Sequence, residues 1–144
     1  MPRLSILVPT YNRASWLQEC LDSLAITTVD CEIVVSDNAS TDGTSELLTR
    51  YEHDPRFRIF RQPENFGAGH NYAFVLEQAR GELLCMFGDD DQAMPGCFEA
   101  KLAMFDAMPE LDLVYSLWHR IDTDGRDLGV VRWPGLLGHS YAGG

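Results

Sequence analysis

Short apolar runs alternate with longer segments of helical periodicity along most of this chain, and this alternation limits the folds that it can adopt. Apolar runs predict strands at residues 4–8, 32–36, 57–60, 82–87 and 113–117. Between them, apolar residues three or four positions apart predict helices near residues 14–26, 42–51, 72–79 and 95–105. This pattern is typical of an α/β fold, with a mostly parallel sheet and helices on both faces.

The predicted strand at residues 82–87 ends in Gly88 and three consecutive aspartates, Asp89, Asp90 and Asp91. Its unbroken apolar run predicts a strand buried on both faces. Neighbouring carboxylates raise the cost of ionising one another, and a hard divalent cation among their oxygens relieves that cost. Because open α/β sheets bind ligands beyond the carboxyl ends of their strands, the pattern predicts a metal site that faces a phosphorylated ligand.

Each candidate residue also has a simpler interpretation. The three aspartates could be a solvated loop, or charges before the helix that Pro95 introduces. Asp37 could be a turn former, and Tyr11 could belong to the core. Asn71 lies near the start of a predicted helix, where it could contact a phosphate group or simply cap the helix.

Charge and cysteine content narrow the classes of function. The net charge of -11 argues against binding to nucleic acid or to an anionic membrane surface. A metal ion can reverse the local field, so a phosphorylated small molecule stays compatible with this charge. The cysteines are widely spaced and include no C-x-x-C pair, which is typical of reduced thiols in a cytoplasmic protein; they are Cys20, Cys31, Cys85 and Cys97.

The two ends of the chain add further expectations. The first strand begins almost at once, so we expect no signal peptide, and no apolar stretch approaches the roughly 20 residues that cross a bilayer. Asp124-Gly125, between Ile121 and the run 128–131, predicts a β-hairpin. Residues 133–144 are rich in glycine and have no clear period, and no linker divides the chain, so we expect a single domain over residues 1–144.

Polar clusters follow the predicted strands at residues 9–13, 36–44, 65–71 and 88–91. In a parallel sheet the carboxyl ends share one edge, so these clusters can converge on one cleft. In order and spacing they resemble the family 2 glycosyltransferases of the GT-A fold, from residue 3 to about residue 116. The motifs are residues 5–13 (SILVPTYNR), 33–44 (IVVSDNASTDGT), 65–67 (NFG) with Asn71, 79–82 (ARGE), and 88–91 (GDDD) with Pro95.

The resemblance implies a nucleotide-diphosphate-sugar donor, a Mn²⁺ or Mg²⁺ ion, and transfer of the sugar to an acceptor hydroxyl with inversion. It implies a glycan or lipid-linked acceptor in cell-envelope or exopolysaccharide synthesis, at the inner face of the cell membrane. By the same resemblance, Pro9, Thr10 and Tyr11 line the base and ribose pocket, and Asp37 accepts a hydrogen bond from the base.

The metal-binding residues also follow from the resemblance. It assigns the metal to the acidic motif, with Asp90 as the direct ligand and Asp91 beside it. Asp89 faces the ribose or the waters of the metal, and Asn71 contributes to nucleotide-sugar binding. Clustered carboxylates suit this ligand, because Mg²⁺ prefers one or two carboxylates together with phosphate oxygens.

The chain departs from the family pattern at two positions and in length. Gly88 stands where an aspartate is usual, which we interpret as a subtype, and Asn38 stands where a second aspartate follows Asp37. Asn38 could alter base preference or simply cap its loop. The resemblance further implies a GT-A, Rossmann-like domain that is truncated after its donor-binding half, with the catalytic base expected beyond residue 144. The chain also has three carboxylates near its end that could be considered as the base, Asp122, Asp124 and Asp127, but a role in a turn explains them better.

Two alternatives to a complete transferase remain. The chain could be a half-domain that binds a nucleotide or nucleotide sugar without turnover, because the region of the base is absent. A phospho-accepting receiver domain is disfavoured, since its acids should be divided between two strands and its lysine should follow the fifth strand, whereas Lys101 lies in a predicted helix. Apolar surface left by an absent half predicts self-association into a homo-oligomer.

Overall fold

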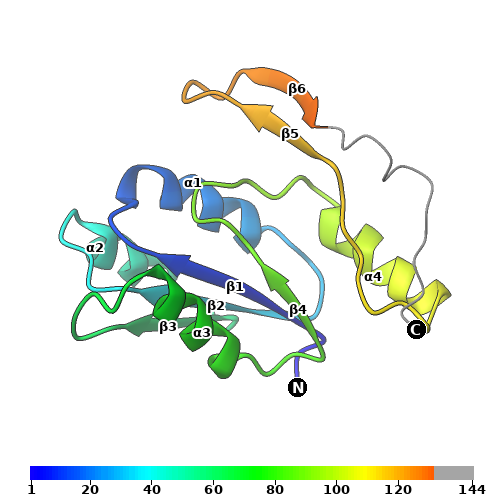
Figure 1. Ribbon diagram of the computed structural model, residues 1–144, viewed down its shortest axis with the longest axis horizontal. Helices are drawn as coiled ribbons and strands as arrows, with labels where there is room; N and C mark the ends of the chain where they lie inside the picture. The colour runs from blue at the N-terminus through cyan, green and yellow to red at the C-terminus, as the bar shows by residue number, and fades with distance from the viewer. Residues whose placement is uncertain (132–144) are drawn as a thin grey trace. The chain divides into compact units, whose positions relative to one another are not determined.

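The computed structural model describes residues 1–131, which form two compact units, residues 1–96 and residues 97–131 (Figure 1). The first unit holds a four-stranded, wholly parallel sheet in the order β3-β2-β1-β4. Its strands are β1 (Leu4–Thr10), β2 (Cys31–Asp37), β3 (Phe57–Arg61) and β4 (Leu83–Met86). The predicted parallel sheet is therefore confirmed, and β1 lies at its interior with β2 and β4 on either side.

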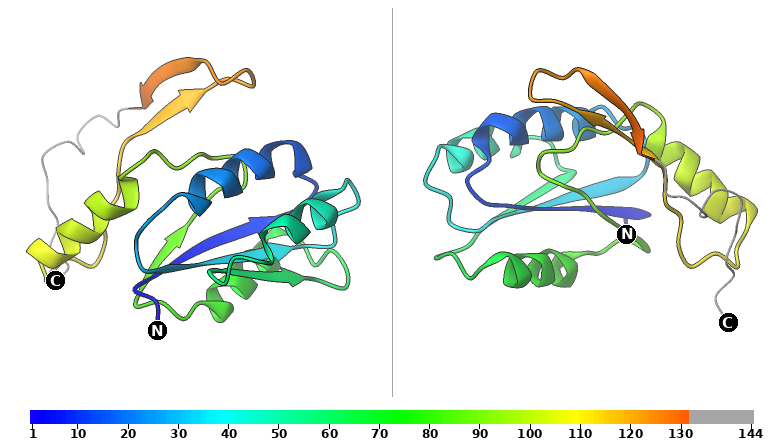
Figure 2. Two further views of the ribbon diagram at one scale, coloured as in Figure 1. Left: turned by 180° about the vertical axis from the view of Figure 1, so that it is seen from behind. Right: turned by 45° about the horizontal axis from the view of Figure 1, so that its top comes forward.

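Helices cover both faces of this sheet. The helical segments are α1 (Ala14–Ala25), α2 (Thr44–Leu48), the 3-10 turn η1 (Thr49–Tyr51) and α3 (Ala68–Gln78). Figure 2 shows α1 and α2 on one face and α3 on the opposite face, as the alternation predicted. No helix within residues 1–131 is long and apolar enough to cross a membrane.

The core forms around β1 and β2, in which every residue is buried. On one face Leu7, Val34 and Val75 pack together, with Phe60 and Ala79 against them. The α1 helix buries its leucines and Cys20 as its periodicity predicted. Both strands are thus shielded on two sides, which is the arrangement that continuous apolar runs favour.

The α3 helix exists where it was predicted, but the apolar residues that indicated it do not form its buried face. Asn71 and Val75 are buried, whereas Tyr72 and Leu76 are each 46% exposed. Apolar residues occur all around this helix, so periodicity alone does not select the buried side. The polar Asn71 points inward because its amide bridges two strand ends, as described below.

The burial of β4 was also predicted wrongly. This strand pairs only with β1 among the described residues and therefore lies at an edge of the sheet. Leu84 is 53% exposed and Met86 is 39% exposed, while Leu83 and Cys85 are partly covered. An apolar run does not distinguish an edge strand from an interior one, because that depends on what the rest of the chain packs against it.

A polar network around Glu32 joins the amino end of the sheet to the segment between α3 and β4. Ser5 Oγ donates to Glu32 Oε1 at 2.5 Å, Arg58 Nη1 donates to Oε2 at 2.8 Å, and the Arg80 amide donates to Oε1 at 2.6 Å. Burial raises the pKa of Glu32, but these hydrogen bonds outweigh it and hold the pKa below its usual value. At Gly81 a Cβ would lie 2.5 Å from the backbone nitrogen of Ser5, so glycine is required there.

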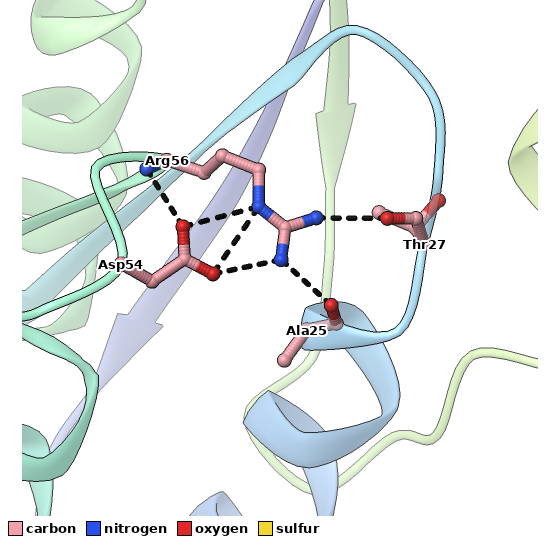
Figure 3. A network of polar contacts seen from close by, with 4 residues as sticks. All are labelled: Ala25, Thr27, Asp54 and Arg56. Atoms are coloured by element: carbon pink, nitrogen blue, oxygen red, sulfur yellow. Dashed lines mark hydrogen bonds and ion pairs between the residues drawn. The ribbon is translucent and has the colours of Figure 1, made fainter.

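A second network fixes the end of α1 to the turn before β3 (Figure 3). Arg56 donates through Nη2 to the Ala25 carbonyl at 2.7 Å and through Nη1 to the Thr27 carbonyl at 2.8 Å. Its guanidinium also forms an ion pair with Asp54 at 2.7 Å. Arg56 therefore satisfies carbonyl groups that the end of a helix leaves without intrahelical partners.

The second unit contains α4 (Cys97–Ala107) and an antiparallel hairpin of β5 (Trp118–Ile121) and β6 (Asp127–Val131). The hairpin predicted around Asp124-Gly125 is confirmed. The prediction of a strand at residues 113–117 is wrong, because those residues form no strand. The turn makes residues 118–121, and not residues 113–117, the strand that pairs with β6. Residues 133–144 lie outside the described residues.

We expect Glu32→Gln to lower the free energy of unfolding at pH 7 by about 1–3 kcal/mol, because it leaves Arg58 without a charged partner. Folding lowers the pKa of Glu32, so its contribution is complete above the unfolded value of about 4.3 and is lost as the pH falls through the lower folded value. Urea unfolding of both proteins between pH 7 and pH 3 measures this, and the difference should shrink on acidification. Glu77→Gln, on the exposed side of α3, is the control; a difference that is as large at pH 3 as at pH 7 would contradict the assignment.

Candidate functional site

The candidate residues gather at the carboxyl edge of the parallel sheet. Thr10 ends β1 and Asp37 ends β2, and the two are paired in register. The segment with the three aspartates leaves β4 at the same edge, where the Phe87 amide donates to the Leu7 carbonyl at 2.9 Å. The sheet therefore brings three of the predicted clusters to one edge, as its parallel topology requires.

Asp37 is buried, with 1% of its surface exposed, and both of its carboxylate oxygens accept hydrogen bonds. Oδ1 accepts from the Ser40 amide at 2.9 Å, and Oδ2 accepts from the Ser45 hydroxyl at 2.6 Å. The turn-forming role considered for Asp37 is thus present in the structure. Each oxygen keeps a further lone pair, so acceptance of a donor from a nucleotide base stays a prediction.

The loop after β1 and the loop after β2 are joined by hydrogen bonds centred on Asn12 and Asp42. The side-chain Oδ1 of Asn12 accepts from the backbone N–H of Thr41 at 2.8 Å, and the backbone N–H of Asn12 donates to Ser40 Oγ at 2.8 Å. Asp42 accepts from the backbone N–H of Thr44 at 3.1 Å and from that of Ala14 at 3.1 Å, which are the first residues of α2 and α1. The sequence predicts Asp42 as the cap of the helix near residues 42–51, but Gly43 holds that position and Asp42 lies one residue before it; the role of Asn12 was missed.

The backbone of these loops explains the residue types. Asn12 has a φ of 53° and Ala39 a φ of 61°, both in the left-handed region. Asparagine adopts this region more readily than most residues, which is the sequence signal that could have identified Asn12. The paired loops therefore hold Tyr11 in place, and its side chain is 42% exposed rather than part of the core.

Asn38 connects the loop after β2 to the loop before α3. Its Nδ2 donates to Asn65 Oδ1 at 2.8 Å, and its Oδ1 accepts from the Phe66 amide at 3.1 Å. Asn65 Oδ1 also accepts from the Gly67 amide at 2.8 Å. An ionised aspartate has no donor for Asn65, so the side-chain amide at position 38 has a structural role in joining the two loops. We call the hydrogen bonds from Asn38 to Asn65 and Phe66 the clasp.

Asn71 bridges the carboxyl ends of β1 and β2. Its Nδ2 donates to the Ser36 carbonyl at 3.0 Å and to the Thr10 carbonyl at 3.3 Å. Its Oδ1 is buried and has no hydrogen-bond partner among residues 1–131. Both donor hydrogens are engaged, so the group that remains is an acceptor, which suits a hydroxyl and not a phosphate oxygen.

The acidic residues after β4 crowd one another. Burial raises the pKa of Asp89 and the charge of Asp90 adds to this, while Thr10 and Arg13 lower it in part. Burial and the Asp90 charge likewise raise the pKa of Asp91. Thr10 Oγ1 has no partner at full hydrogen-bond geometry within residues 1–131, yet it lies close enough to Asp89 to favour the charged carboxylate.

Gly88 allows this crowding. A Cβ at position 88 would lie 2.7 Å from Asp91 Oδ2 and 3.3 Å from Asp90 Oδ1, so these carboxylates fold back over the glycine. Within residues 1–131, no three His, Cys, Asp or Glu side chains are arranged to hold a metal by themselves. The arrangement instead fits a cation that takes one or two carboxylates and completes its coordination with a phosphorylated ligand.

The carboxylates of the hairpin form hydrogen bonds within the hairpin and its turn, as expected. Asp122 Oδ1 accepts from the Asp124 and Arg126 amides at 2.9 Å each. A backbone hydrogen bond from Gly129 and a contact with His119 lower the pKa of Asp127. None of the four cysteines, which all lie within residues 1–131, forms a disulfide, and Cys20 and Cys31 are buried.

Comparisons with known proteins are consistent with this geometry. The chain matches the family described as glycosyl transferase family 2 over residues 5–137. It is 34% identical to a chondroitin synthase of Pasteurella multocida (strain Pm70) over 137 residues, which are 93% of this chain and 14% of that protein. It is 38% identical to the abequosyltransferase RfbV of Salmonella typhimurium over 136 residues, which are 91% of this chain and 39% of that protein.

Solved structures show the same architecture. The S. aureus TarS structure in complex with UDP-GlcNAc has a TM-score of 0.69 at 29% identity, covering 73% of this chain and 31% of that one. The mannosyltransferase PcManGT of Pyrobaculum calidifontis, in complex with GDP-Man and Mn²⁺, has a TM-score of 0.67 at 30% identity, covering 76% and 34%. This chain therefore spans well under half the length of these relatives.

We expect Asn38→Asp to lower the free energy of unfolding by about 1–2 kcal/mol, because the carboxylate cannot donate to Asn65 Oδ1. Urea unfolding at pH 7 measures the loss, and hydrogen exchange at the backbone N–H of Gly67, which donates to the same Asn65 Oδ1, should become faster. A double-mutant cycle with Asn65→Ala supplies the control, since the effect at position 38 should largely vanish in that background. An equal loss in both backgrounds would show that the clasp is not the cause.

Proposed function

This chain belongs to glycosyl transferase family 2, and we propose that it forms the donor-binding part of a metal-dependent, inverting glycosyltransferase. Such an enzyme transfers a sugar from a nucleotide-diphosphate-sugar donor to an acceptor hydroxyl. One observation carries the proposal: the ends of β1 and β2 and the acidic segment after β4 meet at one edge of the sheet. That edge is where open α/β sheets bind ligands.

The nucleoside half of the donor is proposed to bind at the paired loops. The half-exposed Tyr11 offers an aromatic face for the base, beside Pro9 and Thr10. Asp37 offers its remaining lone pairs to a base or ribose donor. The TarS complex with UDP-GlcNAc and the PcManGT complex with GDP-Man support a nucleotide-sugar ligand. Because one donor carries uracil and the other guanine, they do not select the base.

The diphosphate half is proposed to bind at the acidic segment together with Mn²⁺ or Mg²⁺. Asp90 is exposed and is proposed as the direct ligand, with Asp89 and Asp91 beside it. A bound ion supplies Lewis acidity that stabilises the charge of the diphosphate leaving group. The raised pKa values of Asp89 and Asp91 support the proposal, because a cation would remove the cost of keeping these carboxylates charged together.

The acceptor side is proposed to lie in the part of such a protein that this chain does not include. The hairpin carboxylates are engaged in their turn and none is proposed as the base. The relatives include a chondroitin synthase and an abequosyltransferase, which supports a glycan or lipid-linked acceptor in envelope polysaccharide synthesis, at the cytoplasmic face of the membrane. The exposed Leu84 and Met86 on β4 support self-association of the isolated chain.

A half-domain that binds the donor without turnover is the second candidate. It is favoured by one observation, that the chain covers only 14% and 39% of the two enzymes named above. Both candidates predict the same donor site, so binding tests the site and a sugar-transfer assay separates the two. Transfer by the isolated 144-residue chain at a rate typical of an enzyme would exclude the second candidate.

Calorimetric titration with UDP, GDP, dTDP and CDP, each with and without Mn²⁺, tests the donor site. We expect one or more nucleotides to bind in a Mn²⁺-dependent manner and Asp90→Ala to weaken that binding about tenfold or more, because it removes the proposed metal ligand. Asp30→Ala is the matched control, since it removes the same charge from an exposed aspartate at the opposite end of the sheet. No binding by the wild type, or unchanged binding by Asp90→Ala, would refute the proposed site.

A further inference from the structure

We propose that one face of α1 positions the acidic loop, which we define as residues 88–93, and thereby sets its affinity for the metal; this inference rests on the proposed function. Cys20 Sγ donates to the Gly88 carbonyl at 3.4 Å. Ser23 Oγ accepts from the Ala93 amide at 2.9 Å. Glu19 Oε2 accepts from Gln92 Nε2 at 2.6 Å. Each of these contacts lies within the first unit.

The contacts come from a single side of the helix. Cys20 and Ser23 are three positions apart, so their side chains are neighbours on the helix surface. The Ser23 hydroxyl hydrogen is committed to the Cys20 carbonyl at 2.7 Å, which leaves the oxygen lone pairs to accept from Ala93. Ser23 is thus fixed in orientation by its own helix before it meets the loop.

The contacts bracket the three aspartates. Cys20 holds the first residue of the acidic loop, while Glu19 and Ser23 hold its last two residues. The Gly88 carbonyl also accepts from the Asp91 amide at 3.2 Å, so a tight turn closes between the points of attachment. The backbone on both sides of the carboxylates is therefore fixed by groups that need not touch the ligand.

The loop needs such support because its side chains repel one another. The carboxylates of Asp90 and Asp91 fold back over Gly88, and Asp89 lies partly buried beside them. Like charges this close favour an open loop, in which they separate. The α1 contacts oppose that opening, so a cation meets carboxylates that are already gathered and less ordering accompanies binding.

We therefore assign Cys20 and Ser23 as positioning residues for the metal step. Neither is proposed to touch the nucleotide. Their loss should weaken the metal dependence of binding and leave metal-free recognition of the nucleoside unchanged. A purely structural role in the helix would change neither quantity selectively.

The test uses the full chain with Ser23→Ala and Cys20→Ala, and with Cys20→Ser, which retains a donor for the Gly88 carbonyl. Gln18→Ala is the matched control, because Gln18 lies on the same helix and its side chain accepts from Arg50 at 3.3 Å instead. Hydrogen exchange by mass spectrometry on metal-free protein reports the acidic loop. Calorimetry with Mn²⁺ alone, and with UDP or GDP at several Mn²⁺ concentrations, reports metal affinity.

We expect Ser23→Ala and Cys20→Ala to exchange faster at residues 88–93, with β1 and β2 unchanged, and to bind Mn²⁺ about tenfold more weakly. Cys20→Ser should recover most of the affinity, and Gln18→Ala should behave as the wild type. Unchanged loop exchange, or faster exchange with unchanged Mn²⁺ affinity, would overturn the inference alone. Failure of the wild type to bind UDP and GDP in the presence of Mn²⁺ would overturn the proposed function and, with it, this inference.

Discussion

The parallel pairing of β1 with β2 and β4 is the constraint on which the remaining structure depends. It buries β1 completely and brings the segments that follow three strands to one edge. The register sets Thr10 beside Asp37, and the Phe87 amide extends the pairing of β4 toward the acidic loop. Because a parallel ladder aligns strand ends of the same polarity, the site is a consequence of topology before any polar side chain contributes.

Side-chain amides then join the loops that this topology brings together. Asn12 links the first two loops, Asn38 links the second to the loop before α3, and Asn71 ties two strand ends. An amide donates and accepts at once, whereas a carboxylate only accepts. Asparagine can therefore satisfy backbone groups and neighbouring side chains together, and it adds no charge to a site that already crowds its aspartates.

The sequence was sufficient to predict the sheet, its helices, the hairpin and the edge at which Thr10 and Asp37 meet. It was not sufficient for features that depend on partners distant in the chain. The exposure of β4 depends on which strands flank it, and the buried side of α3 depends on Asn71 reaching two strand ends. The clasp of Asn38 with Asn65 was missed because two asparagines in separate loops carry no periodic signal.

The two hydrogen bonds that Asp42 accepts couple motions that would otherwise be separate. Its two oxygens accept from the first residues of α1 and α2, so one side chain supports the start of both helices. Opening either loop breaks bonds to the same carboxylate, and the loop that remains closed then loses part of its support. The segments that carry Tyr11 and Ser40 should consequently fluctuate as one cooperative unit, with a shared opening equilibrium in place of two independent ones.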